Sequence, residues 1–389
     1  MSSAAISPTQ TNWREEWFEF EDATYLNLAG QSPMPKVSLR AIQAAIADKK
    51  YPHHRPDAEF YAVPDRLRAN LAQLIGARPE EVAVTTGASA GAVAVAHALE
   101  WKAGDEVITA AREFPLQYAT WKPMEARVGL TVKVVEPQER FLTADDLMAA
   151  LTPRTNLVSV SMVRFDDGVM LDAKKLAAAC HAQGTLLLLD VSQCCGAVPL
   201  NVRELGADFL ICAGYKWLFG PFGTGFFWIR HDLLGKLRPD AFYWMALDGS
   251  HNFAQLNFQN PKPADNAKRW DAPEWASHFN FNLVGMDASL ELVLKMGAAT
   301  VEEHNRRLIE FMFARLPKDR CVPASPLDAS QRGPYGCFRA RSAEKTAELY
   351  QKLRAENVVV SLREGNIRVS PHLYNTERDI DRLIAVITA

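Results

Sequence analysis

The sequence of 389 residues lacks three features that mark particular classes of protein: a long apolar run, an excess of one charge and a patterned set of cysteines. Its longest apolar stretch, TLLLLDV at 185–191, is far too short to span a bilayer. The net charge of −3 at pH 7 gives no electrostatic reason to expect a nucleic acid or a membrane as partner. The N-terminal MSSAAISPTQTNW has no basic start followed by an apolar core, so we expect no signal peptide and a cytoplasmic location.

The six cysteines show no CxxC and no framework spacing, which predicts reduced structural thiols and no metal site. The adjacent Cys194 and Cys195 are expected to fill space behind a site. A dinucleotide-binding GxGxxG is also missing. The stretch GPFGTG at 220–225 precedes a strand and does not link a strand to a helix, which disfavours an NAD-dependent oxidoreductase.

Between residues 80 and 230, apolar runs rich in Val, Ile and Leu alternate with helix-like segments rich in Ala and Leu. Near-continuous apolar strands separated by helices are typical of a mostly parallel sheet that is buried on both faces. The pattern predicts an α/β domain whose ligands bind beyond the carboxyl ends of the strands. The seven predicted strands are EVAVTT, DEVITAA, TVKVVE, TNLVSVSMV, GTLLLLDV, ADFLICAG and TGFFWIR.

The pattern of predicted helices and strands changes after about residue 285, which predicts a second, smaller α+β domain. A long helical pattern at 284–316 leads into a strand, helix, strand, strand pattern. The stretch 240–280 has no clear period and is expected to be a long ordered excursion. We therefore expect three parts: an N-terminal segment, 1–25, that packs on the small domain; a large domain, 26–284, that binds the ligand; and the small C-terminal domain, 285–389.

Polar side chains follow two of the predicted strands. Asp190 ends LLLLD and Gln193 lies three residues on, while Tyr215 and Lys216 follow LICAG. A partly buried lysine loses its proton readily and can form a Schiff base with an aldehyde. A carboxylate at Asp190 can keep a pyridine nitrogen protonated, and Gln193 can hydrogen-bond a ring hydroxyl. These residues together point to pyridoxal 5′-phosphate (PLP), with Lys216 and Asp190 as the catalytic pair.

Two further segments supply what remains of a PLP site. VAVTTGASAG ends a predicted strand in a Gly/Ser turn that opens a helix, where free N–H groups at Ala88 and Ser89 can hold a phosphate. A helix-capping serine looks the same in sequence, so Ser89 has a structural alternative. REFPLQY follows another strand and offers Phe114 as a flat face for the cofactor ring, although most phenylalanines belong to the core.

The segment 159–230 resembles the class V aminotransferase family of fold-type I PLP enzymes, which includes cysteine desulfurases, kynureninases and isopenicillin-N-epimerase-like proteins. The likeness is carried by LLLLDVSQ and by AGYKWLFGPFGTG, with YLNLAGQSPMP near the start and IRVSPHLYNTERDIDRLI near the end. The resemblance implies a fold-type I architecture, with a seven-stranded, mostly parallel sheet in the large domain. It also implies a homodimer that acts on an amino acid.

The resemblance assigns roles to matching residues. Lys216 matches the Schiff-base lysine, Asp190 the partner of the pyridine nitrogen and Gln193 the contact of the ring hydroxyl. Arg368 in IRVSPHLYN matches the arginine that binds the substrate α-carboxylate, a bidentate task that suits a guanidinium. The remaining assignments are stacking for Phe114 and phosphate binding for Ala88, Ser89 and, as in kynureninase-like members, the phenol of Tyr215.

The sequence also departs from the family pattern. Many relatives carry Ser-x-His before the lysine, where this chain has Ala213 and Tyr215. The family asparagine after VSxVS has no clean counterpart, since 165–167 reads Phe-Asp-Asp, and the threonine of a GTP triplet is missing. SLREGNIRVS has no cysteine, and Cys337 lies in a predicted core strand, so a cysteine desulfurase is not expected.

The reaction itself stays open at this stage. We favour an aminotransferase, with a C–S or C–C lyase or an epimerase as the alternative. The alternatives stay open because these residues do not determine how the substrate carbanion reacts further. A catalytically idle scaffold is disfavoured by the intact Lys216, Asp190 and Gln193. His53 and His54 are taken as exposed loop residues with no assigned role.

Overall fold

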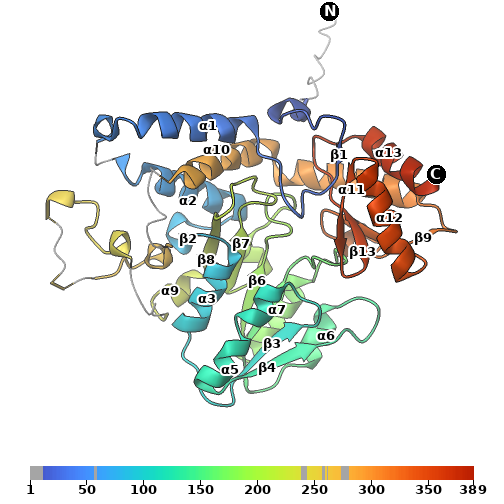
Figure 1. Ribbon diagram of the computed structural model, residues 1–389. Coiled ribbons are helices and arrows are strands. Elements are labelled where there is room, and N and C mark those ends of the chain that lie inside the picture. The colour runs from blue at the N-terminus through green and yellow to red at the C-terminus, as the bar shows by residue number, and fades with distance from the viewer. Residues whose placement is uncertain (1–11, 57–58, 238–242, 256–258, 261, 273–279) are drawn as a thin grey trace, which may run out of the picture.

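The computed structural model describes residues 12–56, 59–237, 243–255, 259–260, 262–272 and 280–389 (Figure 1). Within these ranges, no helix is long and apolar enough to cross a membrane. The chain forms a large part built on a seven-stranded sheet and a smaller part that contains the C-terminus, drawn in orange and red in Figure 1.

The large sheet has the strand order β2-β8-β7-β6-β5-β3-β4. Five neighbouring strands, from β7 to β4, run parallel, whereas β8 is antiparallel to both of its neighbours. All seven predicted strands are present, and the predicted mostly parallel sheet is confirmed. The strands are β2 (Val82–Thr85), β3 (Glu106–Ala110), β4 (Thr131–Val135), β5 (Thr155–Ser161), β6 (Leu186–Asp190), β7 (Phe209–Ala213) and β8 (Gly225–Ile229).

Helices cover both faces of this sheet, which explains why its strands read as continuous apolar runs. Successive residues of β6 point to opposite faces: Leu187 and Leu189 enter one hydrophobic cluster, and Leu188 enters the other. The helices between the strands are α3 (Ala88–Ala98), α4 (Pro115–Ala119), α5 (Lys122–Val128), α6 (Ala144–Ala149), α7 (Ala173–Ala182) and α8 (Val202–Leu205), and α9 (His231–Leu234) follows β8.

Three helices, α1 (Lys36–Asp48), α2 (Ala62–Ile75) and α10 (Phe281–Met296), pack together on the large part. Gly285 allows α1 and α10 to approach closely, because a Cβ there would lie 2.7 Å from the Cδ1 of Ile42. The Ser38 hydroxyl also donates to the Gly285 carbonyl at 2.9 Å. The domain boundary expected between residues 284 and 285 thus falls inside α10, a helix of the large part.

The long helical pattern at 284–316 is helical in the structure, but it is divided into two helices. Gly297, at φ 76°, separates α10 from α11 (Ala298–Arg315). Glycine takes this left-handed conformation without the steric cost that other residues incur. We therefore propose that the large domain ends at Gly297 and that the small domain begins with α11.

The small part is a four-stranded antiparallel sheet of order β12-β13-β10-β9 with three helices. Its strands are β9 (Cys321–Pro323), β10 (Gly336–Ala340), β12 (Ser361–Arg363) and β13 (Asn366–Val369), and its other helices are α12 (Ala343–Ala355) and α13 (Glu377–Thr388). The N-terminal segment joins it, since β1 (Thr24–Tyr25) pairs in parallel with β11 (Val358–Val359).

Short 3-10 helices complete the described chain. His53 and His54 lie in one of them and are exposed, and neither lines the pocket described below. Parts of the excursion at 240–280 lie outside the described residues. These short helices are η1 (Trp13–Glu16), η2 (Pro52–His54), η4 (Pro79–Glu81), η5 (Trp244–Ala246), η6 (Phe253–Gln255), η7 (Ala267–Trp270) and η8 (Ala329–Gln331).

Candidate active site

A pocket of about 270 Å³ lies where β5, β6 and β7 end and α3 begins. Parallel strands deliver their carboxyl ends to one edge of a sheet, so residues far apart in sequence meet there. Seven of the eight predicted site residues line this pocket, and Arg368 does not. The seven are Ala88, Ser89, Phe114, Asp190, Gln193, Tyr215 and Lys216.

Lys216 follows β7 and is only 7% exposed. The pKa of its amine is lowered to about 8: burial is the main cause, the carboxylate of Asp190 opposes it, and the charge of Arg368 adds to the lowering. The Nζ atom lies 5.4 Å from the ring centroid of Phe114 and 5.6 Å from that of Tyr215. The amine is thus held among aromatic rings and is easily deprotonated.

The glycines on both sides of Lys216 permit close approach of backbone segments. A Cβ on Gly214 would lie 2.5 Å from the Thr224 hydroxyl oxygen, and the N–H of Gly220 donates to the Gly214 carbonyl at 2.9 Å. A Cβ on Gly225 would collide with the Cys212 carbonyl and would lie 2.6 Å from the Cα of Gly87. The loop that carries Lys216 is therefore packed directly against the turn that opens α3.

Asp190 and Gln193 lie beside this loop, each 6% exposed. The N–H of Ser192 donates to Asp190 Oδ1 at 2.8 Å. Burial raises the pKa of the Asp190 carboxyl, while the charge of Lys216 and the Ser192 hydrogen bonds oppose that rise. Gln193 donates through Nε2 to the Ala29 carbonyl at 3.3 Å, and its buried Oε1 has no partner among the described residues. That oxygen is an acceptor available to a ligand.

The N-terminus of α3 forms another wall of the pocket. Gly87, at φ 148°, caps this eleven-residue helix and has no side chain that could occupy the free N–H groups of the first turn. Thr86 and Gly87 line the pocket beside Ala88 and Ser89. Free N–H groups and the positive end of a helix dipole make an anion site.

Aromatic side chains form the mouth of the pocket. Phe114 and Phe165 meet edge to face at 5.6 Å, and Tyr215 stacks on Phe222 at 4.2 Å. Phe222 is 58% exposed. No role was assigned to Phe165 or Phe222 from sequence. The position of Phe222 between Pro221 and Gly223 in the turn after Lys216 was the one available signal.

Arg368 lies on β13 behind Phe165. Its Nη1 donates to the Phe165 carbonyl at 2.8 Å, and its guanidinium carbon lies 5.3 Å from the ring centroid of Tyr335. Its Nε has no partner among the described residues, and burial lowers its pKa. Arg368 is 1% exposed, so its guanidinium is buried behind Phe165.

The residues present fit PLP. Lys216 offers an amine of lowered pKa for the aldehyde of PLP, and Asp190 a buried carboxylate for its pyridine nitrogen. The unpartnered Gln193 Oε1 can accept a hydrogen bond from its hydroxyl, and the N-terminus of α3 can bind its phosphate. By contrast, Cys337 is buried in β10, where burial raises the pKa of its thiol to about 12. Among the described residues no group of His, Cys, Asp and Glu could hold a metal ion.

Comparisons with known proteins show the family of this chain. The family model for class V aminotransferases matches residues 24–383. An uncharacterized aminotransferase of Bacillus subtilis is 27% identical, over 83% of this chain and 82% of its own length. The isopenicillin N epimerase of Amycolatopsis lactamdurans is 26% identical, over 97% of this chain and 98% of its own length.

A solved structure shares the fold. The cystine C–S lyase C-DES, in complex with its product cysteine persulfide, superposes with a TM-score of 0.83 at 24% identity, covering 94% of this chain and 97% of the other. The expected fold-type I architecture and the expected cofactor, PLP, are confirmed. This chain belongs to the class V aminotransferase family of PLP-dependent enzymes.

Proposed function

We propose that this chain is an aminotransferase that acts on an amino acid through PLP bound covalently to Lys216. The observation that carries the proposal is the placement of Lys216, a buried amine with a pKa lowered to about 8, in one pocket with Asp190 and the start of α3. Lys216 and Asp190 are the catalytic residues in this proposal.

Each wall of the pocket has a part in holding the cofactor. Asp190, oriented by the Ser192 N–H, would accept a hydrogen bond from the protonated pyridine nitrogen, and Gln193 Oε1 would accept one from the ring hydroxyl. The N–H groups at Ala88 and Ser89, with the phenol of Tyr215, bind the phosphate, and Phe114 covers one face of the ring. When bound, PLP supplies the electron sink for the carbanion at the substrate Cα.

Lys216 then has a second task, which is to move a proton at the substrate Cα. An amine with a pKa near the working pH is well suited to general-base catalysis, and its burial provides that pKa. Arg368 binds the substrate carboxylate after exchanging its bond to the Phe165 carbonyl, and its unpartnered Nε offers a second donor.

A lyase acting on C–S or C–C bonds, or an epimerase, is the second candidate. The isopenicillin N epimerase aligns over nearly the whole chain, and the superposing structure is that of a C–S lyase. Cysteine desulfurase is disfavoured, although a probable cysteine desulfurase of Ureaplasma parvum is 24% identical over 95% of this chain. The reason is that β12 and β13 are joined by the two-residue turn Glu364-Gly365, which leaves no loop for a nucleophilic cysteine.

The test is the visible absorbance of the purified protein, before and after single amino acids are added. We expect a yellow protein whose visible band disappears in a Lys216→Ala variant. Conversion of the bound cofactor to pyridoxamine 5′-phosphate by one amino acid would support transamination. A band that recovers while the amino acid is consumed or inverted would instead support the lyase or epimerase. A colourless protein that takes up no PLP would overturn both.

We also propose that the chain is a homodimer. Phe222, 58% exposed, puts apolar surface at the pocket mouth, and a second copy would cover such surface. Sedimentation equilibrium of the protein should then give twice the chain mass of 43.3 kDa. A monomer at micromolar concentration contradicts this proposal.

A further inference from the structure

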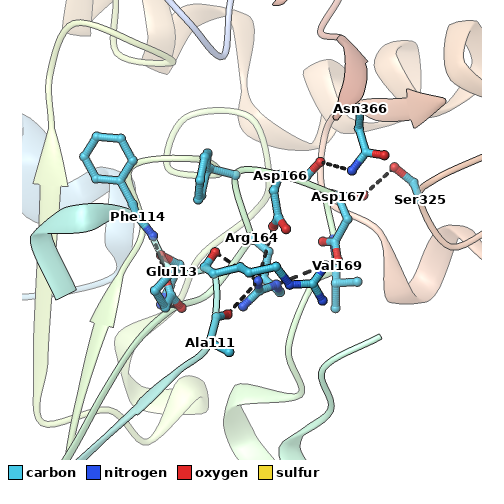
Figure 2. A network of polar contacts seen from close by, with 12 residues as sticks. Ala111, Glu113, Phe114, Arg164, Asp166, Asp167, Val169, Ser325 and Asn366 are labelled. Carbon is cyan, nitrogen blue, oxygen red and sulfur yellow. Dashed lines mark hydrogen bonds and ion pairs between the residues drawn. The ribbon is translucent and has the colours of Figure 1, made fainter. Parts of the chain in front are cut away.

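A buried charged cluster lies beside the pocket, and the proposed reaction does not use it. Figure 2 shows Arg164 at its centre, with Asp166, Asp167 and Glu113 around it. Arg164 and Asp166 are 2% and 1% exposed. Desolvation offsets most of the attraction in buried ion pairs, so such a cluster is weak evidence for a role in stability. Its contacts indicate a role in the geometry of the site.

The Arg164 side chain braces the turn that leads to Phe114. Its Nη2 donates to the carbonyls of Ala111 and Arg112 at 3.0 and 3.1 Å, and lies 3.3 Å from Asp166 Oδ1. Arg112 has φ 52°, a left-handed conformation that is unfavourable for a residue with a side chain. One guanidinium therefore ties down the carbonyls on both sides of a strained backbone position.

This turn carries Glu113 and delivers Phe114 to the pocket wall. The Glu113 carboxylate accepts from the Ser161 N–H and hydroxyl at 2.8 and 2.7 Å, which fastens the turn to the end of β5. Phe114 follows directly, with its ring centroid 5.4 Å from Lys216 Nζ. The position of the Phe114 ring thus depends on the turn that Arg164 braces (Figure 2).

The main chain at Arg164 supports the other side of the site. The Tyr335 hydroxyl donates to the Arg164 carbonyl at 2.6 Å, and the Tyr335 ring lies beneath the guanidinium of Arg368. The next carbonyl, that of Phe165, accepts from Arg368 itself. Asn366 of β13 also donates to the Asp166 carbonyl at 3.0 Å. The segment 164–167 therefore joins the large domain to the strand that carries Arg368.

We propose that Arg164 is a positioning residue that fixes the separation between Phe114 and Arg368, and so orients the carboxylate of an amino acid relative to the cofactor ring. The inference rests on the proposed function. Nη2 makes three of these contacts and Nε lies 3.7 Å from Asp167 Oδ2, so two nitrogens held in one plane reach two carbonyls and two carboxylates, whereas an ammonium is a compact point charge.

Two probes that need no knowledge of the substrate test this inference. Aminooxyacetate and methoxyamine each attack, through an aminooxy nitrogen, the carbon that joins bound PLP to Lys216; the bond to Lys216 breaks, its amine is released and an oxime remains. Only aminooxyacetate carries a carboxylate for Arg368. The ratio of their rate constants, followed by visible absorbance, measures how well that carboxylate is held. In an Arg164→Lys variant with PLP bound, we expect this ratio to fall about tenfold or more, because small misplacements are costly at a reacting centre.

Matched variants separate positioning from stability. Arg368→Lys should lower the same ratio. Arg68→Lys removes a buried arginine whose Nη2 lies 2.8 Å from Asp271, away from the pocket lining, and should lower the melting temperature without changing the ratio. Tyr335→Phe, which deletes only the hydroxyl on the Arg164 carbonyl, should lower the ratio by a smaller factor.

An unchanged ratio in Arg164→Lys and Tyr335→Phe, with PLP bound in both, would overturn the positioning role and leave the proposed function intact. An equal fall of the ratio in Arg68→Lys would also overturn it, because general loosening would then explain the effect. Absence of PLP uptake by the unmodified protein is a separate outcome, and it would overturn the proposed function together with this inference.

Discussion

Burial changes what Lys216 can do at neutral pH, because it penalises the ammonium form. The pKa of this amine is lowered from 10.5 to about 8. Only the neutral amine attacks an aldehyde, and its fraction falls tenfold for each pH unit below the pKa. We therefore expect the rate at which the cofactor-free protein captures PLP to rise with pH and to level off above about pH 8, as measured by stopped-flow absorbance. A rate that does not change between pH 6.5 and 9 would contradict this.

Asp190→Asn tests the partner of the pyridine nitrogen. The amide keeps the shape and the acceptor for the Ser192 N–H but removes the charge. Turnover should fall by about 100-fold or more, since a preorganised charge is lost from the reacting centre. The capture midpoint should also shift to lower pH, because the Asp190 charge raises the pKa of Lys216. Asp287→Asn, which alters a carboxylate paired with Arg66 outside the pocket lining, is the control.

Sequence patterns predicted pocket residues where the chemistry sits on a strand end, as with Lys216 and Asp190. They could not predict that Arg368 lies behind Phe165, because that contact joins residues of two domains. Arg164 was missed for a related reason. A lone arginine is normally exposed, and its burial depends on carbonyls and carboxylates that only the fold brings together.

At the scale of elements, the seven strands were predictable because burial on both faces selects continuous apolar runs. The break between α10 and α11 could not be predicted, because a single glycine is tolerated within a helical pattern. The turn at Gly297 is required by the packing of the two helices on different domains. Strand ends, which position the site, were therefore the most reliable part of the prediction.

Gly225→Ala tests the packing of β8 against the turn before α3. The new Cβ would collide with the Cys212 carbonyl and the Cα of Gly87, both backbone atoms that cannot move away cheaply. We expect a loss of about 1–3 kcal/mol in the free energy of unfolding and weaker PLP binding, because Gly87 opens the phosphate turn. Chemical denaturation and PLP titration measure both. Gly235→Ala, with φ −77° and no atom within 4 Å of the added Cβ, should leave both unchanged.

At the scale of the whole molecule, the N-terminal segment holds the small domain against the Lys216 loop. Trp17 is 2% exposed, and its ring lies 5.0 Å from Phe219 of that loop and 5.1 Å from Tyr374 of the small domain. Its indole N–H donates to the Pro33 carbonyl at 3.2 Å. One side chain therefore connects three separate stretches of chain.

Trp17→Ala should cost about 3–5 kcal/mol of stability, since it leaves a large cavity in a core. It should also increase the rate of PLP loss, because Phe219 lies three residues after Lys216 and would lose its support. Urea denaturation and the decay of the visible band measure the two effects. Phe18→Ala, at a neighbouring side chain that is 47% exposed, should change neither. Equal effects from both variants would contradict the role given to Trp17.

The reversed direction of β8 has a consequence for the order in which the site is assembled. β7, the Lys216 loop and β8 form one local antiparallel unit, which can pair as soon as residue 229 has been synthesised. Local contacts of this kind form quickly, whereas distant ones must wait for loop closure. β2, which leads into the phosphate turn, has no partner in the sheet until β8 arrives beside it. The phosphate turn and the Lys216 loop are therefore brought together only when β2 pairs with β8.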